Sequence, residues 1–193
     1  MFAGSGSLAW HLADVWETRK TVQRTLPSTS VAGLITEVET YRDVDFDFHL
    51  DVPAGWTPTV AFPDEDGIDY GLVIPHTVSF EAPRENEADV FSDYVMVEII
   101  PGSHSGQFIT DGSRAIEVMI DGLSGKRESL AIDEHVIEGE TLDLIVHQAE
   151  IRATGYSVGF FAIGEPKNRQ LLDDAFELMI RSFQFSVPPY RVI

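Results

Sequence analysis

A chain of 193 residues, of which 44% are hydrophobic and 23% charged, has the composition of a globular protein with one sizeable core, which argues against a disordered, fibrous or membrane-spanning chain. The formal charge of -19 disfavours nucleic acid as a partner, because proteins bind phosphate backbones through Lys and Arg. The lack of Cys excludes disulfides, thiolate nucleophiles and cysteine-based metal sites.

The first part of the chain differs in charge from the rest. Residues 1–42 hold as many bases as acids, so the whole acidic excess follows residue 42. Within this balanced part, Ser7 to Leu26 is predicted to form a helix with an irregular apolar stripe, which Ser7 can cap and Pro27 ends. We therefore expect an N-terminal helix and linker over residues 1–40 and one domain over residues 41–193.

The next segment, "YRDVDFDFHLDV" at 41–52, alternates apolar side chains with acids and one histidine. Strict alternation predicts a single strand with one buried and one solvated face. The alternative is a metal site formed by the row of carboxylates. A row on one strand does not converge on one ion without ligands from neighbouring strands, and the turn glycine of a calcium loop is missing. The sequence therefore favours a solvated acidic face.

Further strands are predicted at 57–62, 70–74, 77–82, 93–100, 129–137, 141–153 and 156–163. Two segments have apolar residues at helical spacing: 110–125, with Ile116, Met119, Ile120 and Leu123, and 168–183, with Leu172, Ala175, Phe176, Met179 and Phe183. Asn168 is placed to cap the second helix. Many hairpin-linked strands with few helices predict an α+β fold, in which helices near 113–123 and 168–182 pack on a mainly antiparallel sheet.

No motif gives a strong indication of catalysis. "GYSVG" at 155–159 matches the nucleophile elbow of serine hydrolases, but Ser157 continues into a predicted strand and no histidine follows it, although another triad order would not need one. His135 beside Glu134 and His147 near Glu150 come closest to a ligand or acid–base site, yet their spacing fits no metal motif. We expect ordinary core or surface histidines there, no cofactor and no metal.

Two segments resemble PsbP-like domains. "FDFHLDVPAGW" is similar to their opening strand, which leads to a proline and then a tryptophan, here Trp56. "YSVGFFAIGEPKNRQLLDDAFELMIRSFQF" is similar to their closing strand and helix, which ends in a Ser-Phe pair, here Ser182 and Phe183. The resemblance covers about residues 41–185. The group includes the extrinsic oxygen-evolving subunit of photosystem II, Ran-binding Mog proteins, DcrB lipoproteins and chaperones of type VI secretion effectors.

The resemblance implies an antiparallel sheet sandwiched between helices and mostly non-enzymatic work. We expect an accessory or binding protein that docks on and stabilises or chaperones a larger protein assembly. The alternatives are a carrier of small ligands or metal, and a small acid–base enzyme that uses carboxylate and His groups. The lipobox cysteine and signal peptide of the DcrB type are missing, so the expected location is cytoplasmic, or extracytoplasmic if the N-terminus is processed.

Partner contacts are predicted at aromatic and basic residues, which dominate protein interfaces. Trp56 could instead fill the sheet core, the interpretation that we favour for it. The N-terminal helix could fold back on its own acidic domain, bind a partner protein, or lie on a membrane surface. The predicted partner-binding residues are Trp10, Trp16, Arg19, Lys20, Arg24 and Trp56.

Overall fold

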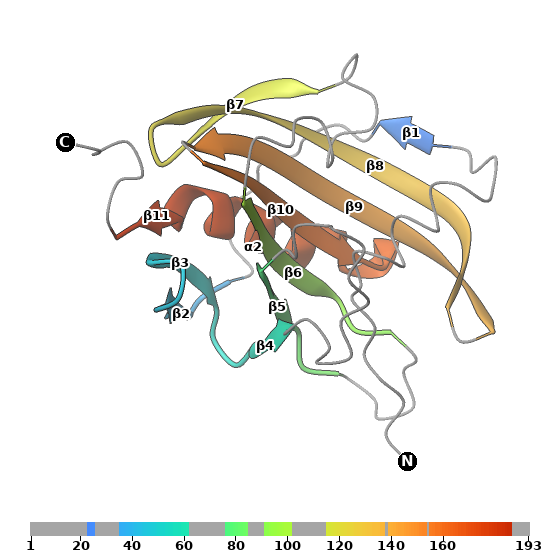
Figure 1. Cartoon of the computed structure of the whole chain (residues 1–193). Coiled ribbons are helices and arrows are strands. Elements are labelled where there is room, and N and C mark those ends of the chain that lie inside the picture. The colour runs from blue at the N-terminus through green and yellow to red at the C-terminus, as the bar shows by residue number, and fades with distance from the viewer. Residues whose placement is uncertain are drawn as a thin grey trace, which may run out of the picture.

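The computed structural model describes seven stretches of the chain (Figure 1). They are residues 23–25, 35–61, 76–84, 91–101, 115–137, 139–153 and 155–186. The strand predicted at 70–74, and the predicted N-terminal helix except for its last residues, lie outside these stretches.

The main element is an eight-stranded sheet in which every pairing is antiparallel, in the order β1-β8-β9-β10-β6-β5-β4 with β7 paired to β8. Its strands are β1 (Gln23–Thr25), β4 (Thr57–Ala61), β5 (His76–Glu81), β6 (Tyr94–Pro101), β7 (Ile116–Ile120), β8 (Leu123–Ile137), β9 (Glu140–Ala153) and β10 (Tyr156–Gly164). The mainly antiparallel sheet is thus confirmed.

A second sheet of three strands has the order β11-β3-β2, with β2 at Val38–Asp43, β3 at Phe48–Pro53 and β11 at Gln184–Phe185. After β10 come a short 3-10 helix, η1 (Pro166–Asn168), and the helix α2 (Arg169–Ser182). In Figure 1, α2 and the small sheet lie on the same side of the main sheet.

The helix predicted at 110–125 is wrong in the described part of that segment. Residues 116–120 form β7, and a tight turn at Asp121 and Gly122 leads directly into β8. Both turn residues have positive φ, 49° and 73°, as the two-residue type I′ hairpin turn requires. Asp-Gly is a strong signal for this turn, and here it overrides the helical spacing of the apolar residues.

The single strand predicted over 41–52 is also wrong, because the chain reverses in its middle. Oδ1 of Asp43 accepts hydrogen bonds from the backbone N–H groups of Asp45 (3.0 Å) and Phe46 (2.9 Å), which ends β2 in a turn. Asp47 follows with a φ of 51°, and β3 then returns along β2. Val44, predicted to be buried, is consequently 84% exposed at the turn.

The helix predicted at 168–183 is confirmed as α2. It buries one stripe against the main sheet, formed by Leu172, Ala175, Phe176, Met179 and Ile180. Asn168 occupies the N-cap position, but its side chain makes no capping bond and donates instead to Asp93 Oδ2 at 2.6 Å. Among the described residues α2 is the one α-helix, so the expected sandwich of helices on both faces is not seen in that part of the chain.

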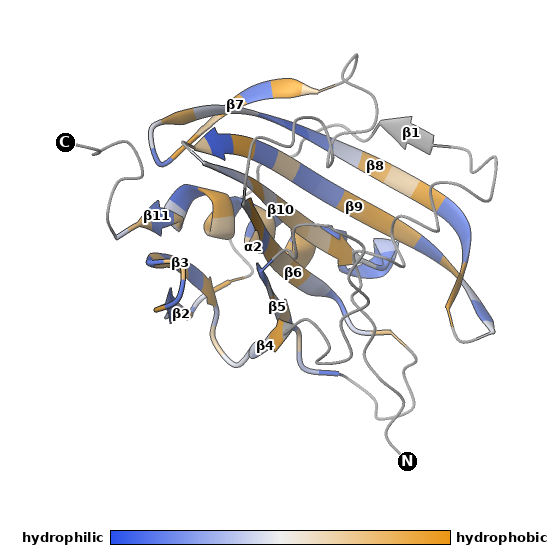
Figure 2. Cartoon of the chain, in the orientation of Figure 1, coloured by the Kyte–Doolittle hydropathy of each residue, from blue (hydrophilic) through white to orange (hydrophobic). Residues whose placement is uncertain are grey.

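The main core lies between the large sheet, α2 and the small sheet. Phe48 on β3 contacts Phe183, and Tyr41 on β2 meets Phe80 on β5 edge to face with ring centroids 5.0 Å apart. Figure 2 shows how hydrophobic and hydrophilic residues alternate along β8 and β9. A second apolar cluster, around Tyr94, Met96, Phe161 and Ile163, lies on the opposite face of the large sheet.

The N-terminal segment contributes a strand to the main sheet. Gln23–Thr25 pairs with β8, with Thr25 opposite Leu130. These three residues were predicted to be helical, and they form a strand instead. Val38 to Thr40 likewise belong to β2 rather than to a linker. Both segments precede residue 41, the predicted start of the domain.

Candidate functional site

One convergence of polar side chains lies between the main sheet and α2. His147 on β9 is directly opposite Ser129 on β8, and its Nδ1 is 2.7 Å from the Ser129 Oγ. Its Nε2 is 2.8 Å from Oδ1 of Asp173 on α2, although not in the direction of a hydrogen bond. A serine, a histidine and an aspartate therefore form one continuous contact chain.

These three residue types are those of a serine hydrolase triad, but their arrangement differs from it. In the triad the serine faces Nε2 and the aspartate faces Nδ1, whereas here the two partners are exchanged. Ser129 and His147 are also cross-strand neighbours, so their contact follows from the sheet register alone. The imidazole packs against Phe176 with ring centroids 5.5 Å apart. We interpret the chain as an attachment of α2 to the sheet.

Charged residues on one edge of α2 extend this attachment. Arg169, Asp173 and Glu177 follow one another at four-residue intervals and therefore lie on one side of the helix. Nε of Arg169 is 3.7 Å from Asp173, and Glu177 pairs with Arg127 of β8. The polar edge of the helix thus reaches both β8 and β9.

A buried aspartate fixes the start of the helical segment. Oδ1 of Asp93 accepts the backbone N–H of Glu165 at 2.9 Å, and its Oδ2 accepts the Asn168 amide. Burial raises the pKa of Asp93 above its ordinary value, although these two hydrogen bonds act in the opposite direction. Gly164 allows this approach, because a β-carbon there would come within 2.6 Å of Asp93 Oδ1. The role of Asp93 is structural.

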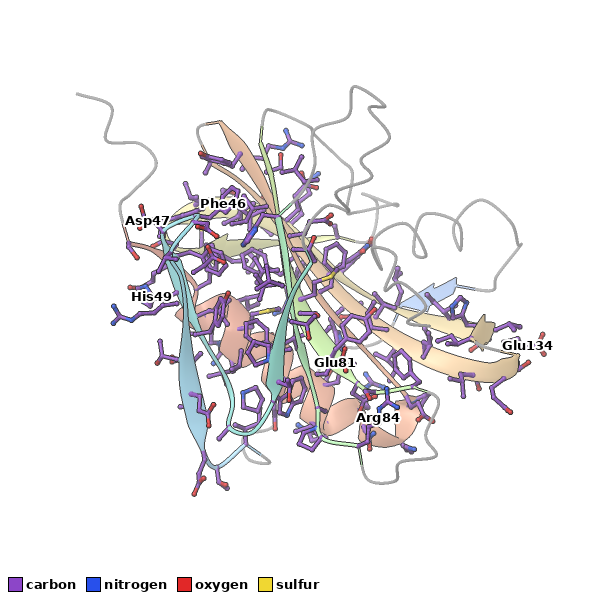
Figure 3. The ribbon with its side chains drawn as sticks, turned by 60° about the horizontal axis from the view of Figure 1, so that its bottom comes forward. Phe46, Asp47, His49, Glu81, Arg84 and Glu134 are labelled. Atoms are coloured by element: carbon purple, nitrogen blue, oxygen red, sulfur yellow. The ribbon has the colours of Figure 1, made fainter. Side chains whose placement is uncertain are left out.

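A third polar group joins the β2–β3 hairpin to β5. Nε2 of His76 is 2.7 Å from Oδ2 of the buried Asp43, and the Tyr41 hydroxyl donates to the same oxygen at 3.3 Å. The ring of Phe46 stacks on His76 at 4.4 Å. Figure 3 shows Phe46 and Asp47 at the end of this hairpin, far from Glu134.

The pKa values in this group shift in opposite directions. For Asp43, burial raises the pKa, but the bonds from His76 and from the backbone outweigh it and the net shift is downward. For Tyr41, burial and the neighbouring Asp43 charge raise the pKa to about 12. The end of the hairpin is therefore held by the ionised carboxylate of Asp43, which accepts hydrogen bonds at both oxygens. The prediction that Asp43 belongs to a solvated row of acids is wrong.

The opposite face of the main sheet buries polar side chains. Glu98 on β6 is only 5% exposed, and burial raises its pKa to about 7. Its neighbours across the sheet are Thr77 on β5 and Gly159 on β10. Other buried polar residues on this face are Thr77, Ser79, Glu128, Gln148, Glu150 and Ser157.

An apolar edge is the most exposed hydrophobic feature of the main sheet. β7 pairs with β8 and with no other described strand. Its residues Ile116 and Met119 are 54% and 64% exposed. Figure 2 shows this hydrophobic strand at the outer edge of the sheet. Large exposed apolar side chains on a sheet edge are typical of an interaction site.

The residues predicted to bind a partner are mostly outside the described stretches, namely Trp10, Trp16, Arg19 and Lys20. Arg24 lies in β1, opposite Ala131. Trp56 is 6% exposed and belongs to the main core, as the packing interpretation expected, so its ring contributes little to a partner surface. The prediction of docking by the N-terminal segment stays a prediction.

The residues of the candidate catalytic motifs lie in strands of the main sheet. Ser157 is buried within β10, so "GYSVG" is not an elbow between strand and helix. Glu134 and His135 lie at a register shift in the β8–β9 ladder, with Glu134 at a φ of 58°. Within the described stretches, no three His, Asp or Glu side chains come together in a way that could hold a metal ion. No described helix has the length and apolar character needed to span a membrane.

Comparison with known proteins finds similarity only at the level of structure. No protein family matches the sequence, and no curated protein matches it. Cyanobacterial PsbP from Synechocystis has a similar structure, with a TM-score of 0.49, 13% identity, and coverage of 81% of this chain and 98% of that chain.

Two further solved structures are similar. LpqN, involved in cell envelope biogenesis of Mycobacterium tuberculosis, has a TM-score of 0.45 and 11% identity over 90% of this chain and 95% of that chain. PA94 from Pseudomonas aeruginosa has a TM-score of 0.39 and 12% identity over 72% of this chain and 91% of that chain. A PsbP is thus among the solved structures to which this chain is similar.

Proposed function

We propose that the protein is a non-catalytic binding protein that docks on a partner protein within a larger assembly. The observation that supports this most directly is the exposed edge strand β7. Ile116 and Met119 expose more than half of their surface there. The chemically competent side chains that we located, His147, Asp43 and Asp93, are engaged in contacts that hold the fold together.

Two other sheet edges, β4 and β2, differ from β7 in a way that supports the same conclusion. β4, the opposite edge of the main sheet, carries Pro58, and β2 carries Glu39 and Arg42. Proline and charged residues discourage pairing with foreign strands. β7 has Glu117 as its one charged residue and no proline. An edge left without such protection is expected to have a partner in the native assembly.

The test is to isolate the tagged full-length chain from its own cells and to measure the mass of its complexes. The wild type should elute with a stoichiometric partner protein, and Met119→Lys should release it because a charge is placed in the apolar contact. Val136→Lys is the matched control, since Val136 is also exposed but lies on β8. A wild-type chain that elutes alone under mild conditions would contradict the proposal.

A small enzyme is the second candidate, because His147 contacts both Ser129 and Asp173. A fluorophosphonate probe labels serines that an adjacent histidine activates. We expect no labelling of Ser129, because its histidine is held beneath α2. Stoichiometric labelling that disappears in His147→Gln would establish the enzymatic alternative.

A further inference from the structure

The backbone of β7 has a defined set of groups available for pairing. In a two-residue hairpin the residues that flank the turn, here Ile120 and Leu123, exchange hydrogen bonds, and such pairs alternate along an antiparallel ladder. Val118 and Ile116 therefore direct their backbone groups toward β8. The N–H and C=O groups of Glu117 and Met119 consequently point away from the sheet.

The side chains beside these groups lie on two faces. Ile120 is buried in the main core and Val118 packs against it, so Ile116, two residues further, extends the α2 side of the sheet. Glu117 and Met119 face the opposite side. An incoming strand would therefore find apolar surface on both of its faces, and one acid at Glu117.

We propose that β7 accepts an extended segment of the partner protein as an added strand, and that this segment alternates basic with apolar residues. The inference rests on the proposed binding function and specifies how the partner is recognised. Main-chain hydrogen bonds to Glu117 and Met119 hold the segment. Contacts with Ile116 and Val118 select the apolar side chains on its α2 side, and its basic side chains lie beside Glu117 on the other side. In Figure 1 the strand would extend the main sheet beyond β7.

The charge of the protein decides which kind of segment can pair with β7. The chain carries a formal charge of -19, so a second copy of it would bring two strongly acidic bodies together. A basic segment is attracted by the same field, and a basic side chain on the outer side of Glu117 forms a favourable cross-strand pair, although Lys126 of β8 already lies opposite Glu117 on its inner side. A basic and apolar segment of another protein is therefore favoured over self-association.

The test uses the full-length protein and a short synthetic peptide in which lysine alternates with isoleucine. Titration should shift the amide resonances of Glu117 and Met119, with a smaller effect elsewhere on the sheet. Met119→Pro removes an outward N–H without removing a hydrogen bond to β8, and it should weaken peptide binding about tenfold. Met119→Thr keeps that N–H and should retain more of the affinity.

A second measurement changes the peptide instead of the protein, in case the proline disturbs the hairpin. Methylation of the backbone nitrogens of the isoleucines, or of the lysines, removes only one of the two alternating sets of donors. One of the two methylated peptides should bind as well as the parent and the other about tenfold more weakly, since only one set faces β7. Equal binding of both would overturn strand addition.

Further outcomes separate the inference from the proposed function. Resonance shifts confined to the β8–β9 hairpin, or a concentration-dependent dimer that Met119→Pro abolishes, would overturn the inference. A native complex that survives Met119→Pro would also overturn it while leaving the proposed function intact. Peptide binding as expected, combined with a wild type that elutes alone from its own cells, would support the added strand and contradict the proposed function.

Discussion

Two buried carboxylates show how the neighbouring groups decide the charge state of a residue. Asp43 accepts bonds from two backbone N–H groups and pairs with His76, so its pKa is lowered despite burial. Glu98 has burial as the cause of its shift, and its pKa rises to about 7. One acid is therefore held charged, whereas the other is only about half ionised near pH 7.

Glu98 makes the stability of the protein depend on pH. Because its pKa rises from 4.5 to about 7 on folding, its contribution is fully present below pH 4.5 and is lost as the pH rises through about 7. Glu98→Gln keeps the shape but cannot ionise. The variant should match the wild type near pH 4 and be more stable at pH 8.5, by a difference on the order of 3 kcal/mol in the free energy of unfolding. Urea denaturation at the two pH values measures it, and equal stability at pH 8.5 would show that Glu98 is solvated.

Asp43 gives the opposite pH dependence. Its pKa is lowered in the folded state, so its contribution is present above its ordinary pKa of 3.8 and is lost as the pH falls through the lower folded value. Asp43→Asn keeps the acceptor for the turn but loses the charge beside His76, and should cost about 1–2 kcal/mol at pH 7. Asp43→Ala loses both and should cost more. If the two variants unfold at the same urea concentration, the turn bonds contribute nothing.

At the scale of elements, the helix α2 offers a matched pair of acids for testing how it is attached. Asp173 contacts His147 and Arg169, whereas its neighbour Asp174 accepts a bond from Gln170 within the helix. Asp173→Ala should lower the free energy of unfolding by about 1–3 kcal/mol, and Asp174→Ala by about 0.5 kcal/mol or less. Hydrogen exchange of the α2 amides should speed up only in the first variant. Equal effects would mean that Asp173 does not help to attach the helix.

The elements that the sequence predicted well are those whose local signals agree. In α2, the apolar spacing and the flanking residues both indicate a helix, and β6, β9 and β10 alternate or run apolar as expected. Two of the errors fall on hairpins. At Asp121–Gly122 a turn dipeptide competes with a helical spacing, and at Asp43–Asp47 a side chain caps a turn inside a perfect alternation.

The candidate sites were less predictable, because they depend on contacts between distant segments. His147 was identified, but with Glu150 rather than with Ser129 and Asp173 as its neighbours. The Ser129 contact depends on the register of β8 against β9, and the Asp173 contact on how α2 crosses the sheet, and neither is encoded in local spacing. The exposed β7 edge was missed because its residues were assigned to a helix.

At the scale of the whole molecule, the described residues 23–25, which precede residue 41, are part of the main sheet. β1 pairs with β8 along the same outer edge that β7 occupies, with Thr25 opposite Leu130 and Ile116 opposite Arg127. Both strands thus lie beside β8, on the side of it that faces away from β9 (Figure 1). A change at either one uncovers part of the edge of β8.

Two deletions test this connection. Removal of residues 1–27 takes away β1, whereas removal of residues 1–22 keeps it, so the difference between the two isolates the strand. We expect the longer deletion to be less stable than the shorter one by about 1 kcal/mol or more, because the backbone groups of β8 from Leu130 to Ile132 lose their partners. It should also self-associate, since an uncovered edge pairs with other chains. Thermal unfolding and sedimentation measure both effects.

If the two truncated chains have equal stability and both remain monomeric, β1 adds nothing to the sheet. The residues before 27 are then available for the docking role predicted from Trp10, Trp16 and their basic neighbours.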